Sequence, residues 1–147
     1  MESQVAQFRS FNRFYTSVIG ILDNYYLNSD YSLTEVRILY ELHYTATELT
    51  ARELTKMLKL DKGYLSRILQ QFEKQELVSK EKSKLDARSA YLRLTPKGES
   101  VFKPLDQASQ QQADVLLKSI AENDVKRLIE SMETIKLILG QINPLTL

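Results

Sequence analysis

Hydrophobic residues at both ends of the chain recur at alternating steps of three and four positions, which is the spacing of a heptad seam on a helix. The N-terminal series comprises Phe8, Phe11, Tyr15, Val18, Leu22 and Tyr25, and the C-terminal series comprises Val125, Leu128, Met132, Ile135, Leu139 and Ile142. One helix alone cannot bury such a seam, so we expect the two terminal helices to pack on each other and on a second copy of the chain. The expected dimer-interface residues are Phe8, Phe11, Tyr15, Leu128, Met132, Ile135 and Leu139. Two ordinary core helices of a monomer are the alternative interpretation.

Capping residues mark the helix starts between these two ends. Ser32 or Thr34 can cap one helix, and Thr50 followed by Glu53 has the spacing of a capping box. After a short connection, Asp61 can cap a further helix. Two short helices joined by a tight turn, the second of which begins at an aspartate cap, predict a helix-turn-helix.

The segment after this helix pair has the pattern of a β-hairpin. Residues 77–80 form a strand candidate, residues 81–89 a polar and basic loop, and residues 90–94 alternate between apolar and polar as a strand does. Thr95 can then cap a helix that has Pro96 at its first position. A hairpin directly after a helix-turn-helix predicts a winged helix.

The predicted fold is therefore mainly α with a small β-hairpin. We expect residues 1–147 to form a single domain, in which a winged helix-turn-helix lobe at residues 31–103 lies between dimerisation helices at residues 1–30 and 104–147. A length of 147 residues suits one domain of this kind.

The composition excludes several classes of chemistry. The chain has no cysteine, which excludes a disulfide, a thiol redox sensor and a thiolate metal site. Its single histidine, His43, leaves no partner for a histidine metal cluster or a catalytic triad. Since the sequence also lacks a Gly-rich phosphate loop and a nucleophile elbow, we expect no enzymatic activity, no cofactor and no metal. The longest apolar run, Val18 to Leu22, is too short for a membrane span, and there is no secretory signal, so we expect a cytoplasmic protein without membrane association.

The charge is unevenly distributed, although the chain as a whole carries only +1. Residues 50–103 hold thirteen Lys or Arg against seven Asp or Glu, a balance of +6, and the rest of the chain has a balance of −5. A basic middle segment between acidic ends favours a polyanionic partner for that segment. A solvated basic face without a ligand is the alternative.

The expected helix pair and hairpin carry side chains that suit double-stranded DNA, because a helix fits the major groove and Arg or Gln can bind base edges there. The expected DNA contacts are Lys62, Tyr64, Ser66, Arg67 and Gln70 on the second helix, Thr50, Arg52 and Lys56 on the first, and Lys82, Lys84 and Arg88 on the hairpin. Asp86 can hold the guanidinium of Arg88 extended for a narrow minor groove, or it can form an Asx turn, and the two roles are compatible. A winged-helix module that binds proteins and no DNA is the alternative.

Two motifs carry a resemblance to a known family. Asp86-Ala87-Arg88 followed by Leu92-Arg93-Leu94-Thr95-Pro96-Lys97-Gly98 resembles the wing-to-helix signature of the MarR (multiple antibiotic resistance regulator) family of bacterial transcription regulators. Leu65-Ser66-Arg67, in a helix that starts Asp61-Lys62-Gly63, resembles the family's recognition helix. The resemblance implies a homodimer with entwined terminal helices that reads a pseudo-palindromic operator, with half-sites roughly 34–36 Å apart. It also implies repression of nearby genes and release by a small aromatic ligand.

Two positions leave questions for the structure. Glu76 stands where the family commonly has glycine, which suits the left-handed conformation that ends a helix, so the end of the recognition helix and the angle of the wing stay open. Tyr25, Tyr40, His43 and Tyr44 cluster near the junction of the first two helices and could line an aromatic ligand pocket. Packing in the core and the dimer interface is the alternative role for these four residues.

Overall fold

The computed structural model describes residues 2–23, 29–45, 48–86 and 88–142. The elements follow one another along the chain as α1 (Gln4–Asp23), α2 (Leu33–Tyr44), β1 (Leu49–Thr50), α3 (Ala51–Leu58), α4 (Lys62–Lys74), β2 (Val78–Lys82), β3 (Ala90–Leu94), α5 (Pro96–Lys118) and α6 (Glu122–Leu139). This order confirms the expected fold class, mainly helical with a small antiparallel sheet in a winged helix-turn-helix arrangement.

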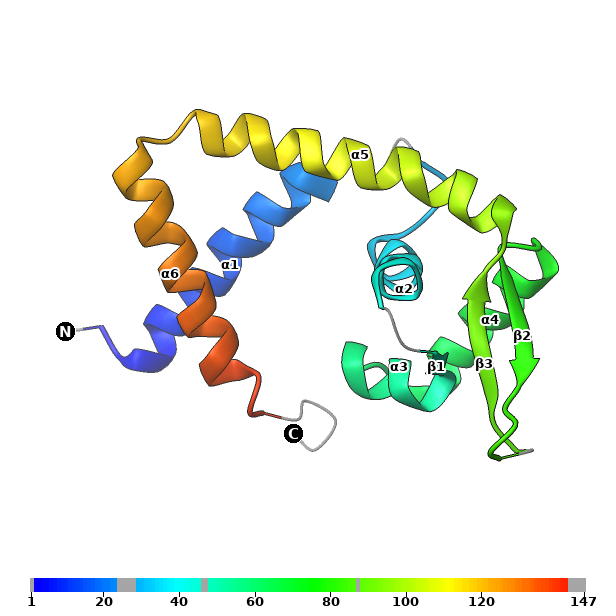
Figure 1. Ribbon diagram of the computed structural model, residues 1–147. Coiled ribbons are helices and arrows are strands. Elements are labelled where there is room, and N and C mark those ends of the chain that lie inside the picture. The colour runs from blue at the N-terminus through cyan, green and yellow to red at the C-terminus, as the bar shows by residue number, and fades with distance from the viewer. Residues whose placement is uncertain (1, 24–28, 46–47, 87, 143–147) are drawn as a thin grey trace.

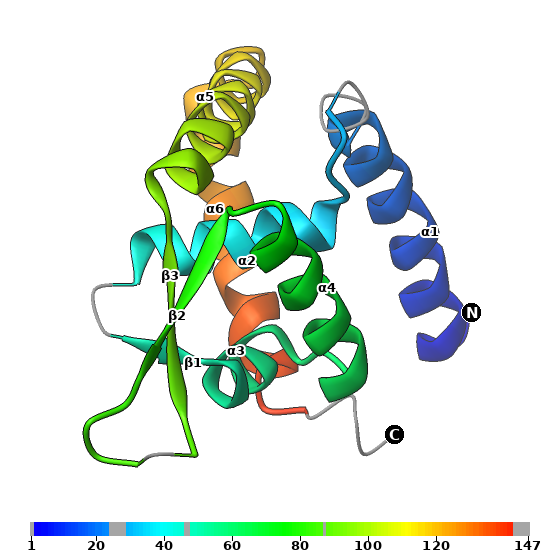
Figure 2. The ribbon, with the colours of Figure 1, turned by 90° about the vertical axis from the view of Figure 1, so that its right-hand side faces the viewer.

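The lobe and the terminal helices lie at opposite ends of the structure. Figure 1 shows α1 and α6 at one end and the β2–β3 hairpin at the other, with α5 running between them. Seen from the side, the hairpin projects away from α5, and α3 and α4 lie next to it (Figure 2). The long helix α5 therefore carries the hairpin base at its start and leads to α6 at its end.

The helix starts follow the capping residues that the sequence indicated. Ser32, and not Thr34, caps α2 in a capping box with Glu35. Thr50 and Glu53 form the expected capping box of α3. The side chain of Asp61 accepts a hydrogen bond from the Tyr64 N–H at the start of α4. These caps satisfy backbone N–H groups that a first helical turn otherwise leaves unpaired, which explains why local sequence sufficed to place them.

The sheet is larger than the predicted hairpin. Its strand order is β1-β3-β2, and β1, which we did not predict, pairs antiparallel with β3 through Leu49 opposite Leu92. The strand β2 starts one residue later than expected and extends through Lys82, which pairs with Ala90, so the assignment of residues 81 and 82 to the loop was wrong. Pairing with β3 supplies the hydrogen bonds that make this polar segment extended.

One core joins the helices and the sheet of the lobe. Its most completely buried side chains are Phe72, Phe102, Ile38, Leu39, Leu54, Leu65 and Leu77. Because these side chains come from α2, α3, α4, the start of β2 and the start of α5, the core holds the two helices of the helix-turn-helix and the hairpin as one body.

The recognition helix ends in a left-handed residue although that residue is not glycine. Glu76 has φ 60°. Its N–H donates to the Glu73 carbonyl over 3.0 Å, and the Leu77 N–H donates to the Phe72 carbonyl over 2.9 Å. These two bonds form a Schellman motif, and the buried Leu77 and Phe72 provide the apolar contact that accompanies it. Glu76 thus ends the helix in the conformation that glycine usually adopts at this position. The wing therefore starts where it would start after a glycine.

The terminal seams do not pack on each other within one chain, so that part of the prediction was wrong. Phe8, Phe11 and Tyr15 are 54%, 42% and 42% exposed. On α6, Met132, Ile135 and Leu139 are 37%, 37% and 40% exposed. Figure 2 shows α1 standing apart from the other helices. The long helix α5, which spans 23 residues, leads away from the lobe to α6, and α1 and α6 leave their apolar side chains exposed.

A polar contact nevertheless ties α6 to the lobe. Lys59, the left-handed residue that ends α3, donates from Nζ to the carbonyl of Ile142 over 2.8 Å and to that of Gly140 over 3.3 Å. Free carbonyls at a helix C-terminus favour a cation.

In the part of the chain that is described, no helix combines the length and the apolar character that crossing a bilayer requires.

Candidate nucleic-acid interface

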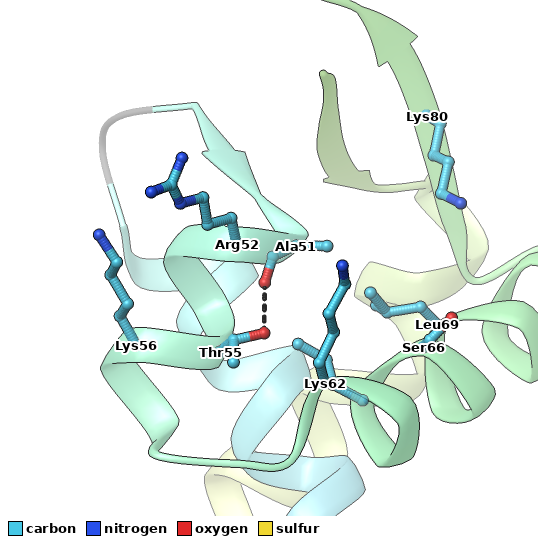
Figure 3. Close-up of a pocket in the computed structure, with 9 residues that line it drawn as sticks. Ala51, Arg52, Thr55, Lys56, Lys62, Ser66, Leu69 and Lys80 are labelled. Atoms are coloured by element: carbon cyan, nitrogen blue, oxygen red, sulfur yellow. Dashed lines mark hydrogen bonds between the residues drawn. The ribbon is translucent and has the colours of Figure 1, made fainter. Parts of the chain in front are cut away.

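A hollow of about 540 Å³ opens between α3, α4 and the start of the wing. It is lined by Ala51, Arg52, Thr55, Lys56, Lys62, Leu65, Ser66, Leu69 and Lys80. Figure 3 shows Arg52 and Lys56 on one helix, Lys62 on the other and Lys80 on the strand, all around the same space. The lining contains four cationic side chains and no carboxylate, so the local electrostatic potential favours anions.

The sequence predicted Arg52, Lys56, Lys62 and Ser66 among these residues as contacts but not Thr55. Its hydroxyl donates to the Ala51 carbonyl over 2.8 Å and lines the hollow (Figure 3). A helical projection could have found it, because Thr55 lies three positions after Arg52 and so shares its face. Thr50, by contrast, donates its hydroxyl to Glu53 over 3.1 Å and accepts from the Glu53 N–H. Both hydrogen bonds of the Thr50 hydroxyl are thus made within the helix cap.

The outer face of α4 presents the expected polar side chains to solvent. Leu65, Ile68, Leu69 and Phe72 point into the core. The exposed face carries Lys62, Tyr64, Ser66, Arg67 and Gln70. These side chains are the types that can bind base edges and phosphates. The amphipathic pattern of the helix thus leaves one continuous polar face beside the hollow.

The wing carries its cations around a turn that Asp86 organises. The Asp86 carboxylate accepts from the Arg88 backbone N–H over 2.9 Å and from the Ser89 hydroxyl over 3.3 Å. It forms no ion pair with the Arg88 guanidinium, so the expectation that it holds that side chain extended was wrong, and the Asx-turn alternative is the correct one. An Asx turn closes on the N–H two residues ahead, which is nearer than the end of a long side chain.

Ion pairs divide the basic residues of the lobe into two groups. Arg93 is bound by Glu48 and by Glu81, and Lys80 lies 2.9 Å from Glu73. Arg52, Lys56, Lys62, Arg67, Lys82, Lys84 and Arg88 form no ion pair with any residue that the structure describes. All seven lie on α3, α4 or the wing and are exposed. Arg37, Lys59, Lys74 and Lys103 of the lobe also form no ion pair with a described residue, but the surface of α3, α4 and the wing holds the largest group of unpaired cations.

Three of the four expected pocket residues gather between α2 and α5. The rings of Tyr40 and Tyr44 lie 4.5 Å apart, and those of His43 and Phe102 lie 4.9 Å apart. His43 Nδ1 lies 2.7 Å from Glu99 Oε2. The structure brings these residues together as packing against the buried Phe102, while the hollow described above lies elsewhere. Tyr25 lies outside the described residues.

The hydroxyl of Tyr44 forms a short hydrogen bond to a carboxylate of α5. It donates to Asp106 Oδ2 over 2.6 Å, and Gln110 donates to the same carboxylate oxygen over 2.9 Å. This hydrogen bond to Asp106, together with burial, raises the pKa of Tyr44 above its ordinary value, because an ionised hydroxyl could no longer donate to the carboxylate.

Comparisons with known proteins give the same fold and a common class of function. Residues 29–89 match the model of the MarR family. The HTH-type transcriptional regulator MgrA of Staphylococcus aureus is 28% identical over 111 residues, which cover 73% of this chain and 74% of that protein. Streptococcus pneumoniae FabT in complex with DNA superposes with a TM-score of 0.77 at 17% identity, covering 90% of this chain and 97% of that one.

A third relative was solved with small molecules. Staphylococcus aureus MarR in complex with salicylate and kanamycin superposes with a TM-score of 0.72 at 23% identity, covering 92% of this chain and 91% of that one. The matched segment runs from before α2 to the loop of the wing and ends before β3, whereas the two superpositions cover 90% and 92% of the chain. The family model, the fold and the relatives thus point the same way: this chain resembles the MarR family of transcriptional regulators.

Proposed function

We propose that this protein is a dimeric, sequence-specific DNA-binding repressor of transcription. The observation that carries the proposal is the surface of seven unpaired cations on α3, α4 and the wing, three of which (Arg52, Lys56 and Lys62) line a hollow without carboxylates. Neutralising phosphates with such side chains releases condensed counterions and drives association with DNA. The FabT relative was solved in complex with DNA and the MgrA relative is a transcriptional regulator, which supports the same function.

In this proposal each element has a separate task. The helix α4 enters the major groove, where Arg67 and Gln70 can bind base edges and Lys62, Tyr64 and Ser66 can bind phosphates. Arg52 and Lys56 of α3 hold the adjacent phosphates, and Thr50 contributes through the helix start that it caps. The wing brings Lys82, Lys84 and Arg88 to the neighbouring minor groove, with Asp86 shaping the turn.

The dimer follows from the apolar seams that one chain leaves uncovered. A single lobe reads one half-site, and two lobes related by a twofold axis read a pseudo-palindrome. Phe8, Phe11 and Tyr15 on α1 and Leu128, Met132, Ile135 and Leu139 on α6 would meet their counterparts in a second copy. We propose that residues 1–30 and 104–147 form this dimerisation part around the lobe at residues 31–103, all within a single domain. We propose a cytoplasmic location, which suits a regulator of transcription.

The proposal is tested by measuring the affinity for DNA against salt concentration. An operator is first selected from a random pool, and the selected sequence should be twofold symmetric. The logarithm of the association constant should then fall steeply as the logarithm of the salt concentration rises, with a slope of about −0.9 for each neutralised phosphate. A slope near zero, or a folded protein that ignores every duplex at low salt, would contradict the proposal and favour a protein-binding module.

A matched pair of arginine variants locates the interface. Arg88→Ala should weaken operator binding by about 1–3 kcal/mol if the wing contact forms. Arg127→Ala removes the same charge from α6, where Arg127 is paired with Asp124 and lies away from the lobe, and should leave the affinity unchanged. Equal affinities of the wild type and Arg88→Ala would remove Arg88 from the interface.

A small aromatic ligand that releases the DNA is a further part of the proposal. The cluster of Tyr40, His43 and Tyr44 beside Phe102 supports it, because these rings, which meet edge to face at the α2–α5 junction, could receive a further aromatic ring. The relative solved with salicylate supports that class of ligand. With salicylate as the probe, operator release should occur in the wild type and be lost in Tyr40→Ala; release that is equal in both would exclude this cluster as the site.

A further inference from the structure

The tip of the wing holds a large apolar side chain almost fully in water. Leu85 is 93% exposed, the highest exposure among the large hydrophobic side chains that are described; the next highest, Leu137, is 70% exposed. A single exposed leucine is ordinary in itself. What distinguishes Leu85 is how its backbone is held and which side chains surround it.

The turn fixes the backbone of Leu85 without using its side chain. Ser83 Oγ accepts from the N–H groups of Leu85 over 3.2 Å and of Asp86 over 3.3 Å. Ser83 is itself buried at 8% exposure, and its N–H donates to the Ser89 carbonyl over 3.0 Å. On the other side, the Asx turn of Asp86 holds the backbone of the described part of the loop through the Arg88 N–H. The leucine side chain is thus presented outward on a prepared turn.

The surroundings of Leu85 are cationic. Lys82, Lys84 and Arg88 flank it, and none of them forms an ion pair with a described residue. The one carboxylate of the tip, Asp86, is occupied by the Arg88 N–H and the Ser89 hydroxyl. An apolar side chain with unpaired cations on both sides along the chain suits a partner surface on which phosphates alternate with apolar sugar and base atoms. A groove of a DNA duplex is such a surface.

We propose that Leu85 enters the minor groove beside each half-site and makes the wing discriminate A·T from G·C base pairs there. In the minor groove A·T and T·A pairs show acceptors only, whereas a G·C pair adds the guanine N2 amino group. That amino group reduces the depth of the groove, and a leucine cannot accept its hydrogen bond. Apolar side chains are also the usual wedges by which minor-groove proteins open a base step. The inference rests on the proposed function and adds a residue that sets specificity.

The test compares three operators that differ only under the wing, where a minor-groove footprint of the wild-type complex first locates it. One carries A·T pairs at these positions, one G·C pairs and one inosine·C pairs, which keep the major-groove face of G·C but lack the N2 amino group. The wild-type dimer should bind the A·T and inosine·C operators roughly five- to tenfold more tightly than the G·C operator. Leu85→Asn, which keeps the size of the side chain, should reduce this preference to less than about twofold with an unchanged salt slope.

Lys84→Ala is the matched control from the same tip. It should weaken binding to all three operators by the same factor and reduce the salt slope by about one phosphate, leaving the preference as in the wild type. A preference that survives in Leu85→Asn, or equal binding of G·C and inosine·C operators, overturns the inference while the proposed function stands. A wild-type protein that binds none of the three with a steep salt dependence overturns both. Thermal midpoints of the two variants within about 2 °C of the wild type show that the exposed substitutions leave the fold intact.

Discussion

Glu76 accepts a backbone conformation that side chains with a Cβ avoid. At φ 60° its Cβ lies close to its own backbone, and for such a residue the left-handed region costs about 1–2 kcal/mol. The cost is tolerated because the Schellman bonds and the burial of Leu77 and Phe72 hold the chain on both sides. The pair with Lys97 at 3.9 Å is too exposed to compensate appreciably.

We therefore predict that Glu76→Gly stabilises the protein. The expected gain in the free energy of unfolding is about 0.5–1 kcal/mol, since glycine removes the strain but adds entropy to the unfolded chain. Urea denaturation measures it. Glu76→Ala is the control, because it keeps a Cβ and should show no comparable gain; a wild-type level of stability in Glu76→Gly would mean that the position carries no strain.

Because of Tyr44, we expect the free energy of unfolding to depend on pH in the alkaline range. Its pKa is raised in the folded protein, first by the hydrogen bond to Asp106 and then by burial, whereas the unfolded chain ionises near the ordinary value of about 10. The folded state therefore holds the proton more tightly, and its contribution to stability is complete below pH 10 and lost as the pH rises through the raised value.

The measurement is the difference in the free energy of unfolding between the wild type and Tyr44→Phe. This difference should favour the wild type at pH 8 and shrink at pH 10.5. Tyr40→Phe serves as the control, because Tyr40 packs in the same cluster through its ring. If the difference for Tyr44→Phe is the same at both pH values, the hydroxyl of Tyr44 does not stabilise the fold through Asp106.

The junction between the wing and α5 depends on a glycine within the first turn of that helix. Thr95 donates from its N–H to the Leu77 carbonyl over 3.0 Å, which draws the helix start onto the start of β2. A Cβ at Gly98 would lie 2.1 Å from the same carbonyl oxygen. Since backbone cannot move aside as a side chain can, only glycine fits, and the resemblance to the family signature at this position has a steric reason.

Gly98→Ala should lower the free energy of unfolding by about 1–3 kcal/mol through overpacking. Gly63→Ala is the comparison. Its Cβ would meet a movable carboxylate oxygen of Asp61 at 3.2 Å, and alanine favours the helix, so we expect a change below about 1 kcal/mol. Urea denaturation measures the free energy of unfolding of both variants. If the two variants are equally stable, the Leu77 carbonyl can move to accommodate the Cβ at position 98.

The assembly of two chains is the largest consequence of the exposed seams on α1 and α6. A charge in the centre of an apolar interface must be desolvated without a partner. We predict that Met132→Lys raises the dissociation constant of the dimer by about a hundredfold or more and weakens operator binding with it. Light scattering measures the mass and a mobility shift the binding. Glu130→Lys, on the side of α6 opposite the seam, should remain dimeric, and an intact Met132→Lys dimer would place the interface elsewhere.

What the sequence by itself determined is local. The caps at Thr50, Asp61 and Thr95, the strand at residues 90–94 and the polar face of α4 depend on neighbours along the chain, and all were predicted from residue types and spacing. The polar and basic side chains exposed on α3, α4 and the wing were named for the same reason, since an exposed face needs no partner to be recognised.

Tertiary structure decided the features that depend on distant partners. The two residues of β1 are too few to show a period, and only β3 makes them a strand. The extension of β2 to Lys82, the left-handed Glu76 and the separation of the terminal helices likewise follow from what the fold places opposite them. Which lysines and arginines stay unpaired was decided in the same way, because Glu48, Glu73 and Glu81 reach Arg93 and Lys80 only across the folded sheet and the end of α4. The sequence gives the number of charges, but only the tertiary structure shows which of them form ion pairs.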